Sequence, residues 1–200
     1  MIKTVIFDLG GVLFTDGTKR AIGIISAKYG VPSEEVDKVM NGELGTKYRI
    51  GEITADEFWE RTRKVLGIQA DNKTLAEIWL SGYEMISGTE KIIKRLKAAG
   101  YEVLFLSDNV EERVNYIEEK YHFLMLFDDG IFSHVVKTRK PDKLMYELVL
   151  AKASHPPSQC IYIADKPKFL EPAKSLGMAC IAFTNPEKLE MELKPHGLSF

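Results

Sequence analysis

The sequence contains only two cysteines in 200 residues, Cys160 and Cys180, and both lie in apolar runs that resemble strands. Such a pair is typical of buried free thiols and not of a disulfide framework, so a reducing compartment is expected. No apolar run is long enough to span a bilayer. The N-terminus also lacks the basic, apolar and small-residue segments of a signal peptide. We therefore expect a cytoplasmic protein without a membrane partner.

An excess of charge of one sign is also missing. The chain has 27 basic and 29 acidic residues, which gives a net charge of -2. No overall field draws such a protein to nucleic acid or to anionic membranes, so we expect no nucleic-acid partner. An anionic ligand would have to be held by local cations. The hydrophobic content of 45% is sufficient for one sizeable core and a modest inserted module.

Strand and helix patterns alternate in two separate parts of the chain. A β-branched and aromatic run ends at Asp8, and further strands are predicted at 101–106, 160–164 and 178–183, with a short one near 131–132. Helical spacing occupies the segments between them, with Thr89 expected as one N-cap and Pro141 in the first turn of another helix. This alternation favours an α/β fold with a Rossmann-like parallel sheet and helices on both faces. The oligomeric state is left open.

The strand signal disappears between Thr18 and Met85. Apolar residues recur there at helical spacing, and Trp59 and Trp79 follow that spacing, so we expect them in the core of a helical bundle and not on a substrate platform. Because the first strand precedes this bundle, the bundle is expected as an insertion. The predicted division is a helical cap domain of residues 17–86 within a core domain of residues 1–16 and 87–200.

Polar side chains follow three of the predicted strands. Asp8, Ser107 and Asp165 each come directly after a buried run or at its end, and Lys140 lies in the loop before a helix. Carboxyl ends of parallel strands meet at one edge of a sheet, where α/β proteins place their sites. Each residue alone is as consistent with an ordinary role: a turn, a helix N-cap, a solvated charge or a loop residue. Together, and in this order, they favour a functional site.

Four segments resemble the motifs of the haloacid dehalogenase-like (HAD) hydrolase superfamily: Phe7–Leu13, Leu106–Asn109, Arg139–Asp142, and Ala164–Asp165 with the following 173–177. The resemblance covers nearly the whole chain, because the helical insertion corresponds to the helical cap of that superfamily. The Asp-Leu-Gly-Gly-Val opening and the Arg-Lys-Pro-Asp stretch are similar to the sugar-phosphatase-like subgroup, near glucose-1-phosphatases and the phosphatase domain of epoxide hydrolases.

The resemblance implies a Mg²⁺-dependent phosphomonoester hydrolase that acts on a small phosphorylated metabolite, with sugar phosphates as one candidate class. Asp8 would be the nucleophile, forming an aspartyl-phosphate that water hydrolyses. Mg²⁺ would be held by Asp8, Asp165 and the backbone carbonyl of Gly10.

The resemblance also implies a phosphate-binding set. The Ser107 hydroxyl and a backbone N–H in the following Asp108–Asn109 would hold the phosphoryl oxygens. Lys140 would neutralise the charge that builds up on them and would stabilise the ionised form of Asp8.

The chain departs from the pattern of the superfamily at several positions. Most of its phosphatases carry a second Asp two residues after the nucleophile as general acid and base, a role worth about 10²–10⁴-fold, and here that position is Gly10. Asp16, in the turn expected to act as a flap, is a candidate substitute. Arg49 is a candidate substrate contact from the cap, with a solvated helix end as the alternative. Lys166 would either weaken metal binding or contact phosphate.

Two other functions remain open at this stage. A non-catalytic protein that binds a phosphorylated ligand or regulates through it is favoured by the weakened motifs at Gly10, Ala164, Lys166 and Phe169. A metal-independent 2-haloacid dehalogenase would use the same Asp to attack carbon. Asp165 at the position of a metal ligand argues against the dehalogenase.

Overall fold

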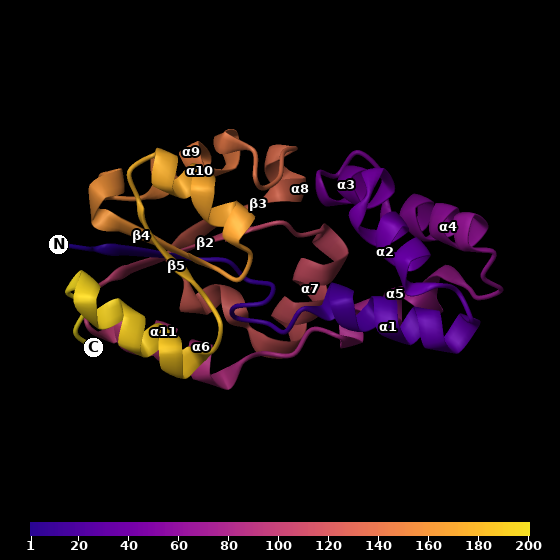
Figure 1. Ribbon diagram of the computed structural model, residues 1–200, viewed down its shortest axis with the longest axis horizontal. Coiled ribbons are helices and arrows are strands. Elements are labelled where there is room, and N and C mark those ends of the chain that lie inside the picture. Colours follow the sequence, from indigo (N-terminus) through magenta and orange to yellow (C-terminus); the bar gives the residue numbers. More distant parts are fainter.

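A computed structural model describes all 200 residues (Figure 1). Its centre is a sheet of five parallel strands in the order β3-β2-β1-β4-β5, which confirms the predicted Rossmann-like α/β core. The strands are β1 (Thr4–Phe7), β2 (Glu102–Ser107), β3 (Asp129–Phe132), β4 (Cys160–Ala164) and β5 (Ala179–Ala182).

The central strand β1 is buried on both faces. Val5 and Phe7 pack into one apolar cluster and Ile6 into another on the opposite face, as expected for a continuous apolar run inside a parallel sheet. Thr4 pairs in register with Glu102 of β2 and with Cys160 of β4. The carboxyl ends of these three strands therefore lie side by side.

Helices cover both faces of the sheet (Figure 1). On one face lie α6 (Ser87–Ala98) and α11 (Pro186–Leu193), and on the other lie α9 (Lys143–Lys152) and α10 (Leu170–Ser175). Two further helices, α7 (Glu111–Tyr121) and α8 (Ser133–Val136), follow β2 and β3 near the carboxyl ends of the strands. Short 3-10 turns complete the core at 123–126, 157–159, 167–169 and 194–196.

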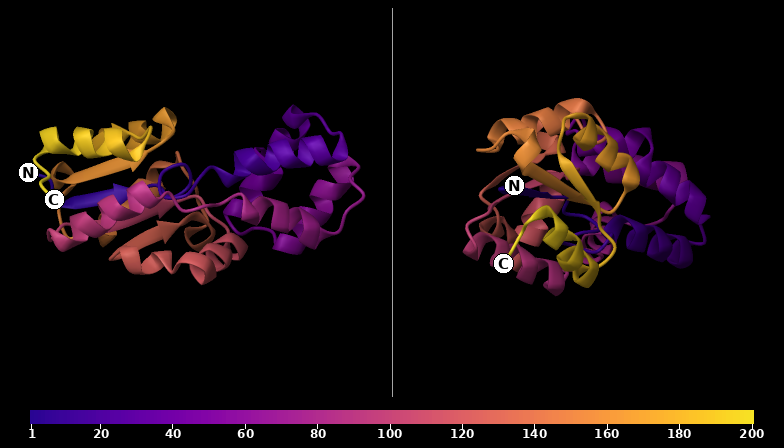
Figure 2. Two further views of the ribbon diagram at one scale, coloured as in Figure 1. Left: turned by 90° about the horizontal axis from the view of Figure 1, so that it is seen from below. Right: turned by 60° about the vertical axis from the view of Figure 1, so that its left-hand side comes forward.

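Five helices lie between β1 and α6 along the chain: α1 (Gly17–Tyr29), α2 (Ser33–Asn41), α3 (Glu43–Arg49), α4 (Ala55–Leu66) and α5 (Asn72–Ser81). They form a separate bundle beyond the carboxyl ends of the strands, opposite the two chain termini (Figure 2). Trp59 and Trp79 are almost fully buried within it, which confirms that they belong to the bundle core. The exact division of the chain at residues 17 and 86 stays a prediction.

Two sets of hydrogen bonds hold the helical bundle against the core domain. The connecting segments pair with each other through the backbone, where Thr15 donates to Glu84 and Ile86 donates to Leu13. On the other side, the Tyr48 hydroxyl of α3 donates to the Glu112 carboxylate of α7 over 2.6 Å. The relative position of cap and core is thus fixed at the edge where the predicted site lies.

Two predicted helix starts are wrong. Thr89 is not an N-cap, because α6 begins at Ser87, after Ile86 has been anchored by its bond to Leu13. Pro141 lies before its helix and not in the first turn, because the Asp142 carboxylate caps the Leu144 amide and α9 begins only at Lys143. None of the helices is both long and apolar enough to cross a bilayer.

Candidate active site

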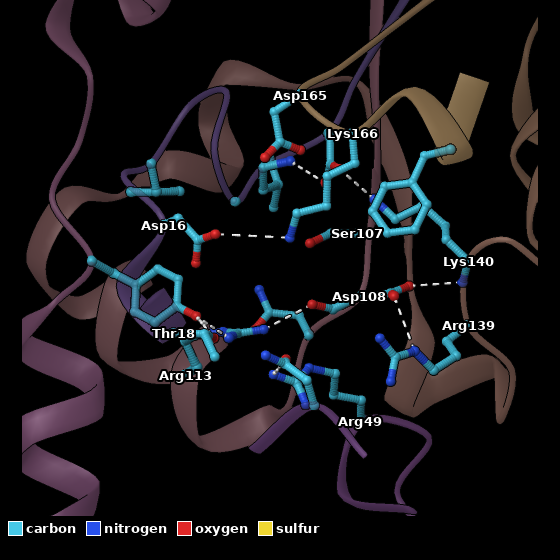
Figure 3. Close-up of a pocket in the computed structure, with 18 of the residues that line it drawn as sticks. Asp16, Thr18, Arg49, Ser107, Asp108, Arg113, Arg139, Lys140, Asp165 and Lys166 are labelled. Carbon is cyan, nitrogen blue, oxygen red and sulfur yellow. Dashed lines mark hydrogen bonds and ion pairs between the residues drawn. The ribbon is translucent and has the colours of Figure 1, made fainter. Parts of the chain in front are cut away.

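All nine residues singled out from the sequence line one pocket between cap and core, with a cavity volume of about 80 Å³. They lie on the loops after β1, β2 and β4, on the loop before α9, and on the cap helix α3 (Figure 3). The nine are Asp8, Gly10, Asp16, Arg49, Ser107, Asp108, Asn109, Lys140 and Asp165.

Asp8 lies directly after the central strand and is only 4% exposed. One carboxylate oxygen, Oδ1, accepts the Leu9 amide over 2.8 Å, and the other, Oδ2, lies 2.6 Å from Lys140 Nζ. Burial raises the pKa of Asp8 to about 6, against the opposing charge and hydrogen bond of Lys140. The carboxylate is therefore held in a fixed orientation with one oxygen facing a cation.

Lys140 is as deeply buried as its partner. Its amine is 3.0 Å from the Leu106 carbonyl and 3.4 Å from the Tyr162 hydroxyl, in addition to Asp8. Its backbone amide donates to the Asp108 carboxylate over 2.9 Å, which fixes the loop that delivers the side chain. Asp108 therefore serves the geometry of Lys140 with its side chain.

Asp165 follows the end of β4 and lines the same pocket as Asp8, and its Oδ1 is buried without any hydrogen-bond partner. Burial raises the pKa of Asp165 against the nearby cations of Lys166 and Lys140. Gly11, with φ of +81°, packs so closely against Asp165 that a Cβ at that position would overlap the carboxylate. An orphaned buried carboxylate oxygen beside a second carboxylate is a donor set that a divalent cation fits.

No group of three or more His, Cys, Asp or Glu side chains converges anywhere in the structure. A cation here would thus be held by Asp8, Asp165 and the Gly10 carbonyl, with water or ligand oxygens completing the shell. Mg²⁺ is commonly bound in this way, by one or two carboxylates and retained waters.

The end of β2 and the loop after it offer one hydroxyl and one backbone amide to the pocket. Ser107 is 2% exposed and lines the cavity beside Lys140. The Asp108 amide makes no hydrogen bond within the protein, whereas the Asn109 amide is taken by Ser133 Oγ over 2.9 Å. The Asn109 side chain accepts from Val110 and Arg113. On this segment, the Ser107 hydroxyl and the Asp108 amide are therefore available to a phosphate, in addition to the Lys140 amine, whereas the Asn109 amide is not.

The candidate residues near the cap have well-defined neighbours (Figure 3). Asp16 caps α1 by accepting the Lys19 amide, and its other oxygen lies 3.8 Å from Lys166 Nζ. Lys166 thus reaches across the pocket toward Asp16. Arg49 is 4% exposed, and burial, together with the charge of Arg113, lowers its pKa to about 10, so it stays charged at neutral pH.

Two further arginines of the pocket received no role from the sequence. Arg139 bonds to Asp108 over 3.2 Å and to Thr46 of the cap over 2.8 Å. Arg113 of α7 contacts Asn109, Tyr83 and the Asp108 carbonyl. Arg113 lies in the first turn of α7, and no sequence pattern distinguished it from a solvated helix residue.

The fold has close structural relatives. The HAD family enzyme BT-2542 of Bacteroides thetaiotaomicron, solved as a magnesium complex, matches with a TM-score of 0.81 at 20% identity, covering 96% of this chain and 98% of that one. The same enzyme in complex with magnesium and inorganic phosphate matches with a TM-score of 0.77 at 20% identity, covering 92% and 96%. At this identity the likeness establishes the shared fold.

Several other protein sequences are also similar to this chain. A Dictyostelium discoideum protein is 29% identical over 74% of this chain. The match covers 66% of that protein, which is just under two thirds of its length. Flavin mononucleotide hydrolase 1 of Arabidopsis thaliana is 25% identical over 88% of this chain and 71% of its own length. The sesquiterpene phosphatase astK of Aspergillus oryzae is 25% identical over 96% of this chain and 95% of its own length.

The family model of the haloacid dehalogenase-like hydrolases matches residues 2–177. This range includes every residue that lines the pocket and ends before β5 and α11. With that match over most of its length, and with the fold and pocket described above, this chain belongs to the haloacid dehalogenase-like hydrolases.

Proposed function

We propose that the protein is a Mg²⁺-dependent phosphomonoester hydrolase that acts on a small phosphorylated metabolite through an aspartyl-phosphate on Asp8. The observation that carries the proposal is the buried pair of Asp8 and Lys140, 2.6 Å apart, beside the unpartnered carboxylate oxygen of Asp165. Similar proteins include two named as hydrolases of phosphorylated compounds and one solved with magnesium and inorganic phosphate.

The first step forms a bond from an Asp8 carboxylate oxygen to phosphorus while the bond from phosphorus to the leaving oxygen breaks. Lys140 stays beside Asp8 and offsets the negative charge of the phosphoryl oxygens, which Ser107 and the Asp108 amide bind. Bound Mg²⁺ would offset the repulsion between the phosphate and the carboxylates of Asp8 and Asp165.

The leaving oxygen needs a proton, and the second step needs one removed from water. Gly10 has no side chain that could give a proton to the leaving oxygen or take one from water. A Cβ at Gly10 would meet nothing within 4 Å, so no neighbouring side chain fills the place of the absent Asp. Asp16 is the carboxylate that we assign to this role, because it lines the same pocket from the start of α1. Water then attacks phosphorus, releases inorganic phosphate and regenerates Asp8.

The open space at Gly10 also favours the second candidate, a protein that binds a phosphorylated ligand without turnover. One experiment separates the two. Phosphate release from p-nitrophenyl phosphate and a panel of sugar phosphates is measured with Mg²⁺ and with chelator, for the wild type, Asp8→Asn and Asp16→Asn.

We expect metal-dependent turnover that falls by at least ~10⁴-fold in Asp8→Asn, because the substitution removes the proposed nucleophile. Asp16→Asn should lose the basic or acidic limb of the pH-rate profile, and an unchanged profile would remove Asp16 from the mechanism. Absence of turnover on every phosphate ester would favour the binding protein, and turnover of 2-haloacids without metal would favour a dehalogenase.

A further inference from the structure

Two buried guanidinium groups meet at the end of the pocket nearest the cap. Arg49 comes from α3 of the cap and Arg113 from α7 of the core, and they are 4% and 5% exposed. Both line the cavity that contains Asp8. Figure 3 shows them at one end of the pocket, while Asp165 lies at the other.

Neither arginine has a carboxylate partner. Arg49 donates to the carbonyls of Met40 and Gly45, over 2.6 and 3.1 Å, and to the Asn41 side-chain oxygen over 3.4 Å. Every acceptor in this set is neutral. No carboxylate oxygen lies within 4.0 Å of the Arg49 guanidinium, so Arg49 forms no ion pair.

The same holds for Arg113. Its acceptors are the Asn109 side chain, the Tyr83 hydroxyl and the Asp108 carbonyl, and its guanidinium lies 4.8 Å from the Trp79 ring centroid. The Asp108 carboxylate, which lines the same pocket, is already bonded to the Arg139 guanidinium and to the Lys140 amide.

A buried charge without a counter-ion is costly in free energy, and neutral acceptors and an aromatic face offset only part of that cost. Each guanidinium has five N–H donors and forms three hydrogen bonds to the protein. Donors therefore remain for a ligand. Two such groups in one cavity make an anion-binding site.

We propose that the substrate carries a second anionic group, a carboxylate or a further phosphate, which Arg49 and Arg113 bind while its ester phosphate reacts at Asp8. This inference rests on the proposed phosphatase function and narrows its substrate class. The ester phosphate has its own cation in Lys140, with Ser107 and the Asp108 amide, so the two arginines serve a different group.

The size of the cavity limits what separates the two anions. A volume of about 80 Å³ corresponds to roughly five to eight water molecules. A short carbon skeleton between the two anionic groups fits this space. Larger leaving groups require the cap to move away from the core.

The first test measures binding without turnover. Calorimetry in the presence of Mg²⁺ compares 3-phosphonopropionate with propylphosphonate, which share a carbon skeleton and differ by the carboxylate. A third ligand, propane-1,3-bisphosphonate, separates a carboxylate from a second phosphate group as the preferred anion. We expect one of the two ligands with a second anionic group to bind at least ~10-fold more tightly than propylphosphonate.

The second test measures selectivity in variants. The ratio of kcat/KM for 3-phosphoglycerate to that for glycerol 3-phosphate is determined for the wild type, Arg49→Gln, Arg113→Gln and Arg49→Lys, with 1,3-propanediol bisphosphate and propyl phosphate as the second pair. We expect the ratio for the preferred pair to fall ~10- to 100-fold in each Gln variant and to recover in part in Arg49→Lys. Arg61→Gln is the matched control, because Arg61 is an exposed cap arginine that faces Glu57.

The outcomes are distinct for the two proposals. If propylphosphonate binds as tightly as both ligands with a second anionic group, or if the ratios are the same in Arg49→Gln as in the wild type, the second-anion site is refuted and the phosphatase function stands. If no ester is hydrolysed, the phosphatase function fails, and calorimetry with the phosphonates still decides whether the two arginines bind an anion. Circular dichroism confirms that each variant is folded.

Discussion

The core wall of the pocket, formed by Asp8, Ser107, Lys140 and Asp165, differs in how charge is compensated from the wall nearest the cap. This cap wall is formed by Arg49 of the cap helix α3 and Arg113 of the core helix α7. On the core wall a buried amine and a buried carboxylate lie 2.6 Å apart. On the cap wall two buried guanidiniums have only neutral acceptors. The Asp8–Lys140 ion pair suits the phosphoryl transfer, which is the same for every phosphate ester. The two arginines without a counter-ion suit the binding of an anionic group that belongs to a particular substrate.

Among changes that leave the nucleophile in place, the largest expected effect comes from breaking the pair on the core wall. Lys140→Met leaves the Asp8 carboxylate buried without its cation, so we expect kcat/KM for phosphate esters to fall about 10²–10³-fold. The free energy of unfolding should fall by about 3 kcal/mol, because one partner of a buried pair is removed. Steady-state kinetics and urea denaturation measure the two effects.

The control for this change is Lys143→Met, three residues further along the same segment. Lys143 is 60% exposed at its side chain and faces Glu147 one helical turn away. Removing such a surface pair costs less than about 1 kcal/mol. Equal losses of activity in the two variants would mean that the buried pair has no special role.

A smaller effect is expected when the core wall is disturbed without loss of a charge. In Gly11→Ala the new methyl group overlaps the Asp165 carboxylate, so Mg²⁺ affinity should fall about tenfold, in the range typical for groups that position metal ligands. Calorimetric titration with Mg²⁺ measures this affinity.

Gly100→Ala is the matched control for the backbone. Gly100 has φ of +86°, close to the +81° of Gly11, and a Cβ there would meet nothing within 4 Å. Both variants should lose about 1–2 kcal/mol of stability from the left-handed conformation. Only Gly11→Ala should lose Mg²⁺ affinity. A similar loss of affinity in both variants would mean that the contact with Asp165 is not the cause.

The mildest perturbation is a change of pH. Burial raises the pKa of Asp8 to about 6, so in the metal-free protein this carboxyl holds a proton below that pH, whereas in the unfolded chain it releases it near 3.8. The native state therefore binds more protons between about pH 4 and 6, and the contribution of Asp8 to stability decreases as the pH rises through that window.

A cation must displace the same proton. Mg²⁺ affinity should thus be constant above about pH 7 and should fall by about tenfold per pH unit below pH 6, since protons and metal compete for Asp8. Titrations at pH 5, 6, 7 and 8 measure this. Affinity that does not change from pH 5 to 8 would mean that Asp8 is not a ligand.

The core wall was largely predictable from the sequence. Asp8, Ser107 and Asp165 follow strands whose apolar runs are unambiguous, and parallel strands bring their carboxyl ends to one edge. Lys140 was predicted from its motif as the partner of Asp8, and the structure places its amine there.

The cap wall was only partly predictable. Arg113 lies in a helix start with two preceding glutamates, a pattern that equally describes a solvated face, and its burial results from packing of Trp79 and Tyr83 over α7. Arg49 was named as a candidate, but its lack of a counter-ion depends on which side chains the cap folds toward it. Local propensity carries no information on such contacts between distant segments.

The most direct test of phosphoryl transfer on the core wall is to trap the phosphorylated enzyme. The protein is mixed with Mg²⁺ and a substrate that it turns over, quenched in acid within one turnover and digested, and the peptides are analysed by mass spectrometry. The account predicts one phosphate on Asp8, absent from Asp8→Asn and from protein quenched before substrate is added. Turnover that proceeds at the same rate in Asp8→Asn, or a phosphate carried by another residue, would contradict it.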